Sequence, residues 1–313
     1  MTSLNRIRFL IDQRVPMRDG VTLSVDVFLP KGNGPFPAIL SRNPYESSSQ
    51  GALKKGVWWA EREYVFVSAD CRGRYESEGE FYPHHPDIRD GHDTVEWIAQ
   101  QPWSDGKVGT SGGSYGGAVQ WELARERPPH LTAMAPHVYG DNRYNNVHYV
   151  GGAFQLLLSL MAGITFSTNM PTPNFGPVFR DGIVLKHLPL IDLDLETIGK
   201  KIPWYRDWLT HPTYDEYWNE IDTSDKYDRI EVPAFMRCGW FDAYPPGMFR
   251  LWQGMRQNGR TKLARENTKI LMGPWSHGDP DGTRVGDLDV GADSLVYMAD
   301  EDKRWFDYWL KGI

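Results

Sequence analysis

The sequence predicts an α/β fold, with a mostly parallel sheet and an inserted helical cap, and three observations lead to this prediction. Apolar, strand-like segments alternate with helical patterns over residues 1–140. The alternation stops over residues 141–228, where aromatic side chains, helical stretches and prolines predominate. It resumes over residues 229–313. Because alternating strands and helices build parallel sheets, we expect residues 1–140 and 229–313 to form one core and residues 141–228 to form the cap.

The individual elements follow from periodicity and from turn residues. Two strands, Arg6–Val15 and Thr22–Phe28, flank an Arg-Asp-Gly turn and are expected to form a hairpin. Further strands are predicted at Ala38–Ser41, Tyr64–Ala69, Val108–Gly112, Leu131–Val138, Ala234–Gly239 and Lys269–Gly273. Helices are predicted at Val57–Arg62, after a polar loop over Glu46–Gly51, and at Asp87–Gln101, Pro246–Met255 and Ala299–Leu310. In the cap, a helix is predicted at Phe154–Ala162.

The stretch Lys107–Gln120 contains GGSYG at residues 112–116, which fits the pattern G-x-S-x-G. This pattern marks a strand-to-helix turn so sharp that its serine, Ser114, is exposed at the apex. Free N–H groups at the start of the helix can stabilise negative charge there. An overlapping match places Ser111 at the centre instead. We favour Ser114, because a turn at Ser111 would shorten the strand and open the helix on two glycines, each weakening it by roughly 1 kcal/mol.

Two residues in the second half of the chain are expected to serve this serine. A serine hydroxyl needs a base within hydrogen-bond reach, and the base needs an acid to orient it. In a sheet of this kind both follow later strands, with the acid before the histidine. Asp242 is the first carboxylate after one late strand, and His277 follows the last strand and is the only histidine after His211. We therefore predict a catalytic triad of Ser114, Asp242 and His277.

Composition narrows the classes of function. The net charge of −7 argues against nucleic acid or an anionic membrane surface as the main partner. The two cysteines, Cys71 and Cys238, are far apart and indicate neither a disulfide framework nor a zinc site. The N-terminal residues lack a signal-peptide pattern, and the longest nearly apolar run, Phe154–Ile164, is too short to cross a bilayer. We therefore expect a cytoplasmic protein.

Neither a metal ion nor an organic cofactor is predicted. His84 and His85 are adjacent, but no carboxylate lies at a spacing typical of a metal site, so we expect them in a solvated loop. The scattered histidines before His277 are interpreted as structural. The acidic segment Asp279–Asp293 resembles a calcium-binding loop only in composition, because the glycine and final glutamate of such loops are out of register.

Five segments carry a distinctive combination of motifs. They are RNPY at 42–45, DCRGRYESEGEF at 70–81, DGKVGTSGGSYGG at 105–117, GWFDAY at 239–244 and GPWSHG at 273–278. Together they resemble the CocE/NonD family of serine hydrolases, which is related to the X-Pro dipeptidyl-peptidases, the α-amino ester hydrolases and the glutaryl acylases. The resemblance covers nearly the whole chain, and it implies an α/β-hydrolase fold.

The resemblance also implies the roles of individual residues. Ser114 would be the nucleophile, His277 the base and Asp242 the orienting acid. The phenol of Tyr45 and the backbone N–H of Tyr115 would form the oxyanion hole. Such a role for Tyr45 is physically reasonable, because a phenol with a pKa near 10 stays protonated at neutral pH and can donate to a tetrahedral oxyanion.

The sequence departs from the family pattern in two respects. Family members usually continue into a C-terminal jelly-roll domain, whereas this sequence ends at Ile313. Three interpretations follow: a fragment, a jelly roll on another chain, or a member without one. Under each interpretation the sequence leaves one wall of the pocket undefined. It also leaves undecided whether the chain associates with another chain or with a copy of itself. Second, no carboxylate cluster that would hold a substrate ammonium group follows Asp242, which leaves Asp141 as a weak candidate for that role.

The favoured function is that of a serine hydrolase that cleaves a carboxylic ester, or an amide, of a small molecule through an acyl-enzyme. The aromatic residues of the cap favour an apolar or aromatic acyl group. One alternative keeps the triad and makes the protein an X-Pro dipeptidyl-peptidase. Another is an acyltransferase, or a non-catalytic subunit of a larger assembly.

Overall fold

The structure, a computed structural model, describes residues 7–169, 182, 184–278 and 282–313. Its centre is an eight-stranded sheet in the order β1-β2-β4-β3-β5-β6-β9-β10. The strands are β1 (Ile7–Pro16), β2 (Thr22–Pro30), β3 (Phe36–Asn43), β4 (Val65–Asp70), β5 (Ser104–Gly113), β6 (Leu131–His137), β9 (Phe235–Gly239) and β10 (Lys269–Gly273). Within this sheet β1 pairs antiparallel with β2, and β2 with β4; the strands from β4 to β10 are parallel neighbours. The predicted mostly parallel α/β fold is confirmed.

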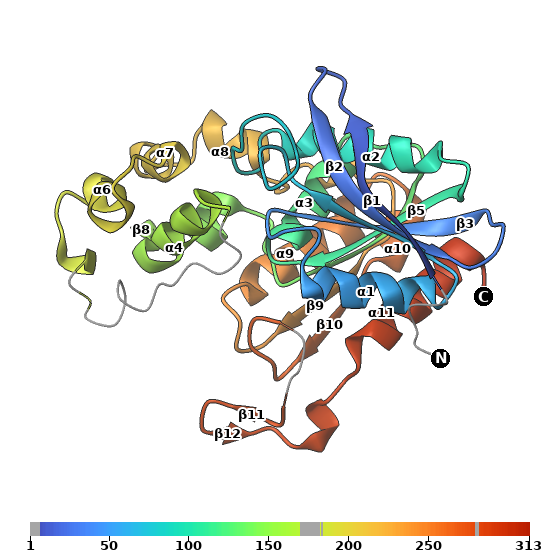
Figure 1. The fold of residues 1–313 in the computed structure, drawn as a ribbon. Coiled ribbons are helices and arrows are strands. Elements are labelled where there is room, and N and C mark those ends of the chain that lie inside the picture. The colour runs from blue at the N-terminus through green and yellow to red at the C-terminus, as the bar shows by residue number, and fades with distance from the viewer. Residues whose placement is uncertain (1–6, 170–181, 183, 279–281) are drawn as a thin grey trace.

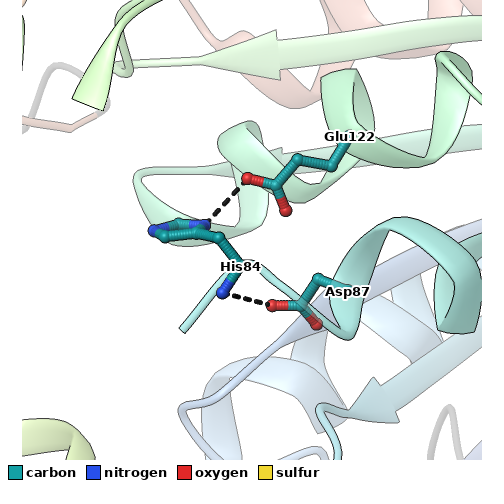
Figure 2. Close-up of side chains that lie close together, drawn as sticks. All are labelled: His84, Asp87 and Glu122. Carbon is teal, nitrogen blue, oxygen red and sulfur yellow. Dashed lines mark hydrogen bonds and ion pairs between the residues drawn. The ribbon is translucent and has the colours of Figure 1, made fainter. Parts of the chain in front are cut away.

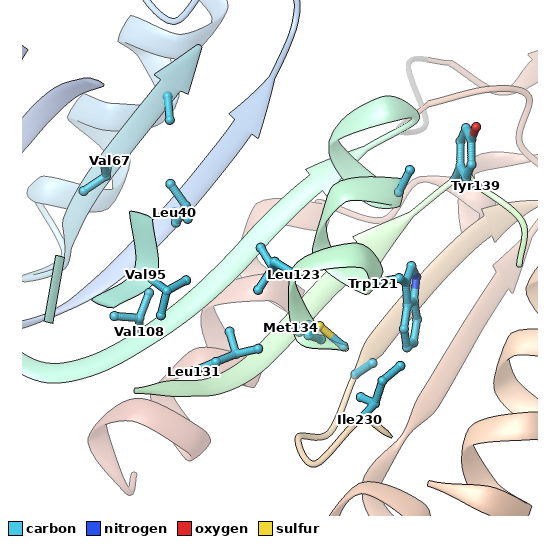
Figure 3. Close-up of a cluster of buried hydrophobic side chains, with 14 of the residues drawn as sticks. Leu40, Val67, Val95, Val108, Trp121, Leu123, Leu131, Met134, Tyr139 and Ile230 are labelled. Carbon is cyan, nitrogen blue, oxygen red and sulfur yellow. The ribbon is translucent and has the colours of Figure 1, made fainter. Parts of the chain in front are cut away.

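Helices cover both faces of this sheet (Figure 1). On one face lie α1 (Gln50–Ala60) and α11 (Met298–Phe306). On the other face lie α2 (Asp87–Ala99), α3 (Tyr115–Ala124), α9 (Pro245–Asn258) and α10 (Lys262–Asn267). Side chains along a strand alternate between faces, so Ile39 packs in the first layer and its neighbour Leu40 in the second. Figure 3 shows part of the second layer, in which Leu40 and Val108 of the sheet lie near Val95 and Leu123 of the helices.

A helical segment is inserted between β6 and β9, and Figure 1 shows it as green to yellow ribbon beside the sheet. It contains α4 (Leu156–Phe166), α6 (Leu193–Ile198), α7 (Pro203–Thr210) and α8 (Glu216–Ile221), with short strands β7 (Tyr149–Val150) and β8 (Ala153–Phe154). These elements bury a hydrophobic cluster of their own, which includes Leu160, Tyr205 and Trp218. The segment is helical as expected, while the division at residues 140/141 and 228/229 stays a prediction.

Short elements complete the described chain. Single turns of 3-10 helix occur at Val184–Lys186, Leu190–Asp192, Tyr227–Arg229 and Ala292–Ser294, and π-helical turns at Tyr144–His148 and Asp307–Lys311. Two-residue strands β11 (Arg284–Val285) and β12 (Leu288–Asp289) form a separate hairpin. None of the helices in the described ranges is both long enough and apolar enough to cross a lipid bilayer.

The helix predicted at Val57–Arg62 is the clearest difference from expectation. It begins at Gln50, within the stretch predicted as a polar loop, because the Ser49 hydroxyl accepts a hydrogen bond from the N–H of Ala52 at 3.2 Å and caps it. Helix α10 was not predicted at all, since its six residues are too few for a periodic pattern. Arg6, the predicted first residue of the first strand, lies outside the described residues.

Candidate active site

Ser114 lies at the turn between β5 and α3, where the sequence pattern predicts an apex. Its φ of 55° is in the left-handed region that residues other than glycine rarely adopt. Its N–H donates to the carbonyl of His137 on β6 at 3.0 Å, and its own carbonyl accepts the first bonds of α3. A Cβ at Gly117 would lie 2.6 Å from the His137 carbonyl oxygen, so only glycine permits this approach of helix to strand. The turn therefore fixes the position of the serine side chain.

Ser111, the alternative nucleophile, occupies a different place. It lies within β5, where it pairs with Ala135 of β6 and continues the strand. Its hydroxyl is 3.4 Å from the carboxylate of Asp302 on α11. It lines a hollow together with His137 and Arg237, and Ser114 does not line that hollow. The geometry of a strained turn thus belongs to Ser114 and not to Ser111.

Tyr45 reaches Ser114 from the loop after β3. Its hydroxyl forms hydrogen bonds with the Ser114 side chain and with the backbone N–H of Tyr115. Although 40% of the residue is exposed, the hydroxyl lies among buried groups, and this burial raises the pKa of Tyr45 more than the two hydrogen bonds lower it. The phenol therefore keeps its proton at neutral pH. This proximity agrees with the predicted oxyanion hole, whose function stays a prediction.

A buried carboxylate holds the segment just beyond Tyr45. Asp70, the last residue of β4, accepts hydrogen bonds from the N–H of Ser47 at 2.7 Å and from its hydroxyl at 2.9 Å. Burial raises the pKa of Asp70 to about 7, although the hydrogen bonds from Ser47 lower it. Asp70 therefore ties the loop that carries Tyr45 to the neighbouring strand.

His277 and Asp242 lie side by side in the loops after β10 and β9. Nδ1 of His277 is 2.9 Å from Oδ2 and 3.1 Å from Oδ1 of Asp242. The last residues of the two strands, Gly239 and Gly273, are partners in the parallel ladder, so both loops start at one sheet edge. The Asp242 side chain is 1% exposed, whereas that of His277 is 47% exposed. A buried carboxylate that faces Nδ1 requires the proton there, which leaves Nε2 free to accept one.

The proposed triad is not joined into one continuous chain of hydrogen bonds. Across the described ranges, no hydrogen bond connects the Ser114 hydroxyl with His277. Tyr244 borders both groups, because its ring centroid lies 5.6 Å from that of His277 and it also lines the pocket at Ser114. Catalytic hydrogen bonds are often long before substrate binds. The structure thus brings together Ser114 with Tyr45 and Tyr115, and His277 with Asp242; the triad as a unit stays a prediction.

A pocket of about 190 Å³ opens at Ser114. Its walls are mostly aromatic and aliphatic, and α4 and α7 of the helical segment contribute to them. The lining residues are Tyr45, His84, Ser114, Tyr115, Tyr139, Val147, His148, Leu158, Met161, Ala162, Thr165, Phe166, Trp208 and Tyr244. A larger hollow of about 720 Å³ lies elsewhere and is lined mainly by charged residues. The smaller pocket combines apolar walls with the strained serine, so it is the candidate site for a substrate.

Two histidines that sequence analysis did not assign to a site line this pocket. His84 is only 4% exposed, so the expectation of a solvated loop is wrong for it. Its Nδ1 lies 2.8 Å from Glu122, and its backbone N–H is 3.3 Å from Asp87, as Figure 2 shows. His148 is also buried, with Nδ1 3.0 Å from the Ser159 hydroxyl. The only local signal was Asp87 three residues after His84; nothing in the sequence links either residue to Glu122.

His84, Asp87 and Glu122 could each offer one ligand atom to a cation, and these atoms lie within 4.8 Å of one another. However, Arg42 donates to Asp87 at 2.8 Å, and Arg143 donates to Glu122. Two guanidinium groups therefore already neutralise the carboxylates and would repel a metal ion. We read the cluster as a charge-balanced wall and assign no metal to it.

Asp141, the weak candidate for holding a substrate ammonium group, is occupied within the protein. It is buried, pairs with Arg250 at 3.1 Å and accepts a hydrogen bond from the Tyr227 hydroxyl at 3.1 Å. Its carboxylate therefore holds the helical segment to α9 and is not directed at a substrate. Asp279 and Asp281 of the acidic segment lie outside the described residues.

A mostly parallel sheet, a sharp strand-to-helix turn at a serine and an acid–histidine pair after later strands together define the α/β-hydrolase fold. Comparison with known proteins then identifies the family. Residues 19–279 match the family described as X-Pro dipeptidyl-peptidase (S15 family), and the chain belongs to it.

Individual relatives agree with this assignment. The chain is 32% identical to cocaine esterase of Rhodococcus sp. (strain MB1 Bresler), over 95% of this chain and 54% of that protein. It resembles the structure of an aminopeptidase from a marine sediment Thaumarchaeota archaeon, with a TM-score of 0.81 and 22% identity over 98% of this chain and 55% of the other. The structure of a CocE/NonD family hydrolase from Staphylococcus aureus matches with a TM-score of 0.68 and 20% identity, over 98% of this chain and 51% of the other. The chain spans about half the length of these relatives.

Proposed function

We propose that this chain is the catalytic part of a serine hydrolase that cleaves a carboxylic ester, or an amide, through an acyl-enzyme. One observation carries the proposal: the Tyr45 hydroxyl meets the Tyr115 N–H and the side chain of Ser114, which lies at a strained turn beside an apolar pocket. The His277–Asp242 pair at the same sheet edge supports it. Membership of the S15 family and the likeness to cocaine esterase support it further.

The chemistry follows the roles of these groups. The Ser114 hydroxyl attacks the carbonyl carbon while Nε2 of His277 takes its proton, and Asp242 stabilises the imidazolium that forms. The Tyr45 hydroxyl and the Tyr115 N–H donate to the oxyanion. Collapse of the tetrahedral intermediate expels the alcohol, which receives the proton from His277, and leaves Ser114 acylated. Water, activated by His277, attacks the acyl-enzyme in the same way and releases the acid.

Paired serine variants test the proposal. We expect Ser114→Ala to lower kcat for p-nitrophenyl phenylacetate by at least about 10⁴-fold, since loss of a nucleophile removes the covalent route. Ser111→Ala should retain turnover, because its hydroxyl faces α11. Both variants should keep the unfolding temperature of the parent. A fluorophosphonate should label Ser114 in the parent and in Ser111→Ala, and should leave Ser114→Ala unlabelled. Loss of turnover in Ser111→Ala but not in Ser114→Ala would overturn the assignment.

The family description and the archaeal aminopeptidase favour a second candidate, release of X-Pro dipeptides. That reaction needs an acceptor for a free N-terminal ammonium group. Among the described residues that line the pocket, none is Asp or Glu, and this favours an ester or acyl-amide substrate. Assays of Xaa-Pro p-nitroanilides against simple p-nitrophenyl esters separate the two candidates.

The acyltransferase and the non-catalytic subunit stay as further alternatives. Labelling of Ser114 by a fluorophosphonate would exclude a non-catalytic role. Product analysis in the presence of an added amine or alcohol would detect transfer, because the acyl group would then appear as an amide or a new ester and not as the free acid.

A further inference from the structure

A second imidazole–carboxylate pair, His84 with Glu122, lies in the wall of the pocket that contains Ser114. The hydrolytic steps described above do not use it. Both residues are buried, with His84 4% and Glu122 0% exposed. A buried polar pair beside aromatic and aliphatic walls is a candidate determinant of which acyl groups the pocket accepts.

Contacts with Tyr115 fix the ring of His84 beside the proposed nucleophile. The two rings stack, with centroids 4.4 Å apart and an interplanar angle of 15°. The backbone N–H of His84 donates to the Tyr115 hydroxyl at 2.9 Å, and that hydroxyl donates to Asp87 at 2.5 Å. Because Tyr115 directly follows Ser114, the position of the His84 ring relative to the reacting carbonyl is set by the turn itself.

The position of the proton on His84 follows from its partner. Nδ1 is 2.8 Å from Oε1 of Glu122, a distance at which two lone pairs would repel, so one of the two atoms carries a proton. Burial by itself raises the pKa of Glu122, but His84 and Arg143 outweigh it, and the pKa falls to about 2. Glu122 is therefore an ionised acceptor, and the proton is on Nδ1 of His84.

Arg143 contacts the same carboxylate. Its guanidinium donates to the same Oε1 of Glu122, and the residue is 0% exposed. Arg143 therefore balances the charge of Glu122. In the neutral form of the ring, with its proton on Nδ1, Nε2 is an acceptor. Figure 2 shows Nε2 on the side of the ring away from Glu122, and among the described residues it has no hydrogen-bond partner.

We propose that Nε2 of His84 accepts a hydrogen bond from the acyl group of the substrate, so that the pocket selects acyl groups that carry a hydroxyl or a neutral N–H donor. Glu122 is the positioning residue that keeps Nε2 an acceptor. The inference rests on the proposed esterase function and names its substrate class: esters of hydroxylated, otherwise apolar or aromatic acids. An acyl group without a donor leaves the buried nitrogen unpaired, which a polar site penalises strongly.

A panel of p-nitrophenyl esters tests the preference. It contains the esters of phenylacetic, mandelic, 3-hydroxyphenylacetic and 4-hydroxyphenylacetic acids, and the methoxy counterpart of each hydroxylated acid. We expect at least one hydroxylated ester to exceed phenylacetate in kcat/KM by about tenfold or more, and its methoxy counterpart to lose that gain. Equal rates for hydroxylated and unsubstituted esters, or a preference for the methoxy esters, would overturn the proposal.

Glu122→Leu and Glu122→Gln together test the positioning role. Arg143 and Nδ1 of His84 both meet Oε1 of Glu122, so the amide oxygen of Gln would take that place, keep the ring proton on Nδ1 and retain the hydroxy-to-methoxy ratio. Leu removes the acceptor, so the ring proton is no longer held on Nδ1 and the ratio should fall. A residue with only a structural role would lower the rates of all esters in parallel, and an unchanged hydroxy-to-methoxy ratio in Glu122→Leu would contradict the assignment.

His84→Phe covers the case in which Glu122→Leu does not fold. It keeps a ring against Tyr115 but removes both nitrogens, so the ratio of hydroxylated to unsubstituted ester should fall to about one. His85→Phe is the matched control, because His85 is the next residue, contacts Glu220 at 3.3 Å and does not line the pocket. It should keep the parent ratio. If His84→Phe kept the parent's ratio of hydroxylated to unsubstituted ester, the proposal would be wrong.

A binding measurement separates this inference from the proposed function. Phenylacetone and its 3- and 4-hydroxy derivatives present the same acyl groups but have no ester bond to cleave. Calorimetry with the unmodified protein should show tighter binding of a hydroxylated ketone by about tenfold, and His84→Phe should remove the difference. If no ester is turned over but this preference exists, the proposed function fails and the inference holds. If esters are turned over and no preference exists in either assay, only the inference fails.

Discussion

Tyr45 combines an apolar wall and a polar donor in one side chain. Its ring lies against Phe166, with centroids 6.1 Å apart, while its hydroxyl meets Ser114 and the N–H of Tyr115. Its backbone N–H donates to the Asn43 side chain at 2.8 Å, so the loop that carries the ring is held at both ends of the residue. The two functions of the side chain can therefore be separated by removing a single oxygen atom.

We predict that Tyr45→Phe lowers kcat by about 10²–10³-fold with little change in KM, because the lost donor acts on the oxyanion of the transition state and not on the bound ester. Steady-state kinetics with p-nitrophenyl esters measure the effect. Tyr308→Phe, at an exposed position outside the pocket, is the control. A change confined to KM would show that the hydroxyl contributes to ground-state binding instead.

The carboxylate of Asp70 predicts how stability depends on pH. Burial raises its pKa from 3.8 to about 7. Between about pH 4 and pH 7 the folded state therefore holds a proton that the unfolded state has lost, and the free energy of unfolding falls as the pH rises through this window. The stabilisation that comes from protonated Asp70 is fully present below its pKa in the unfolded chain and is lost above its pKa in the folded protein.

Asp70→Asn should remove this dependence, because an amide can accept from the Ser47 N–H and donate to its hydroxyl without a charge. Denaturant unfolding at pH 5 and pH 8 should show a smaller decrease for the variant than for the parent, by an upper limit of about 2–3 kcal/mol. Parallel behaviour of the two proteins would mean that Asp70 stays ionised in the folded state.

At this scale, residues that follow strands could be predicted and residues that meet only in the folded molecule could not. Asp242 and His277 were found because parallel strands end at one sheet edge, so the first suitable side chains after them converge. The contact between His84 and Glu122 joins a loop residue to the last turn of a buried helix. No spacing in the sequence encodes it, because it depends on how α3 packs against the loop before α2.

At the scale of elements, α11 packs on the sheet only because β5 presents a glycine to it. A Cβ at Gly109 would lie 2.5 Å from the ring of Phe306, and 3.1 Å from Leu310 just beyond the helix. Phe306 is 0% exposed, so its ring has little room to move away. The close approach of the C-terminal helix is therefore a property of one strand position.

We predict that Gly109→Ala destabilises the protein by about 1–3 kcal/mol through overpacking of this interface. Thermal and denaturant unfolding measure the effect. Gly51→Ala is the matched control, because Gly51 lies in the first turn of α1, where a Cβ would meet nothing closer than 3.9 Å. It should be neutral or slightly stabilising. Equal effects of the two substitutions would argue against the overpacking account.

Element boundaries show what periodicity can and cannot predict. The strands of the parallel core, such as Lys269–Gly273, were placed within a few residues because both of their faces are apolar. The early start of α1 was missed because its first turns are polar and lie on the surface, where only the capping serine marks the boundary. The order of the strands in the sheet was not predicted, since it depends on how each crossover packs.

At the scale of the whole molecule, the chain has more than one hydrophobic core. The two layers against the sheet and the cluster of the inserted helical segment are built from different residues. Arg143 and Asp222 connect them through buried polar contacts, since the Arg143 N–H donates to the Asp222 carboxylate at 2.5 Å and the Arg143 side chain reaches Glu122 of α3. Because the clusters are built from different residues, a perturbation of the inserted cluster should remain local.

Trp218→Ala tests this organisation. Trp218 is 0% exposed within the inserted cluster, and its truncation should cost about 3–5 kcal/mol. Hydrogen exchange should accelerate in α4, α7 and α8, while the amides of β5 and β6 keep their protection. Trp240→Ala, at a tryptophan that is 55% exposed, is the control. A uniform loss of protection across the sheet would show instead that the molecule unfolds as one unit.

The predicted partners of this protein stay predictions, but the structure shows the surface on which they depend. Several large apolar side chains are exposed near the later strands and in the C-terminal third: Trp240, Phe241, Leu288, Leu295, Tyr297 and Tyr308. Exposed groups of this kind are typical of contact surfaces. The expected association with a jelly-roll domain, another chain or a second copy would have to cover some of them.

Tyr115 contributes its N–H to the site of the proposed oxyanion, its ring to the stack with His84 and its hydroxyl to the bond with Asp87. A mutation at this position would therefore alter reaction rate and selectivity at once, and natural selection should hold it constant. Leu158, Met161 and Thr165 on α4 line the same pocket without these shared duties. When related enzymes diverge in substrate specificity, the sequence differences should therefore concentrate on α4.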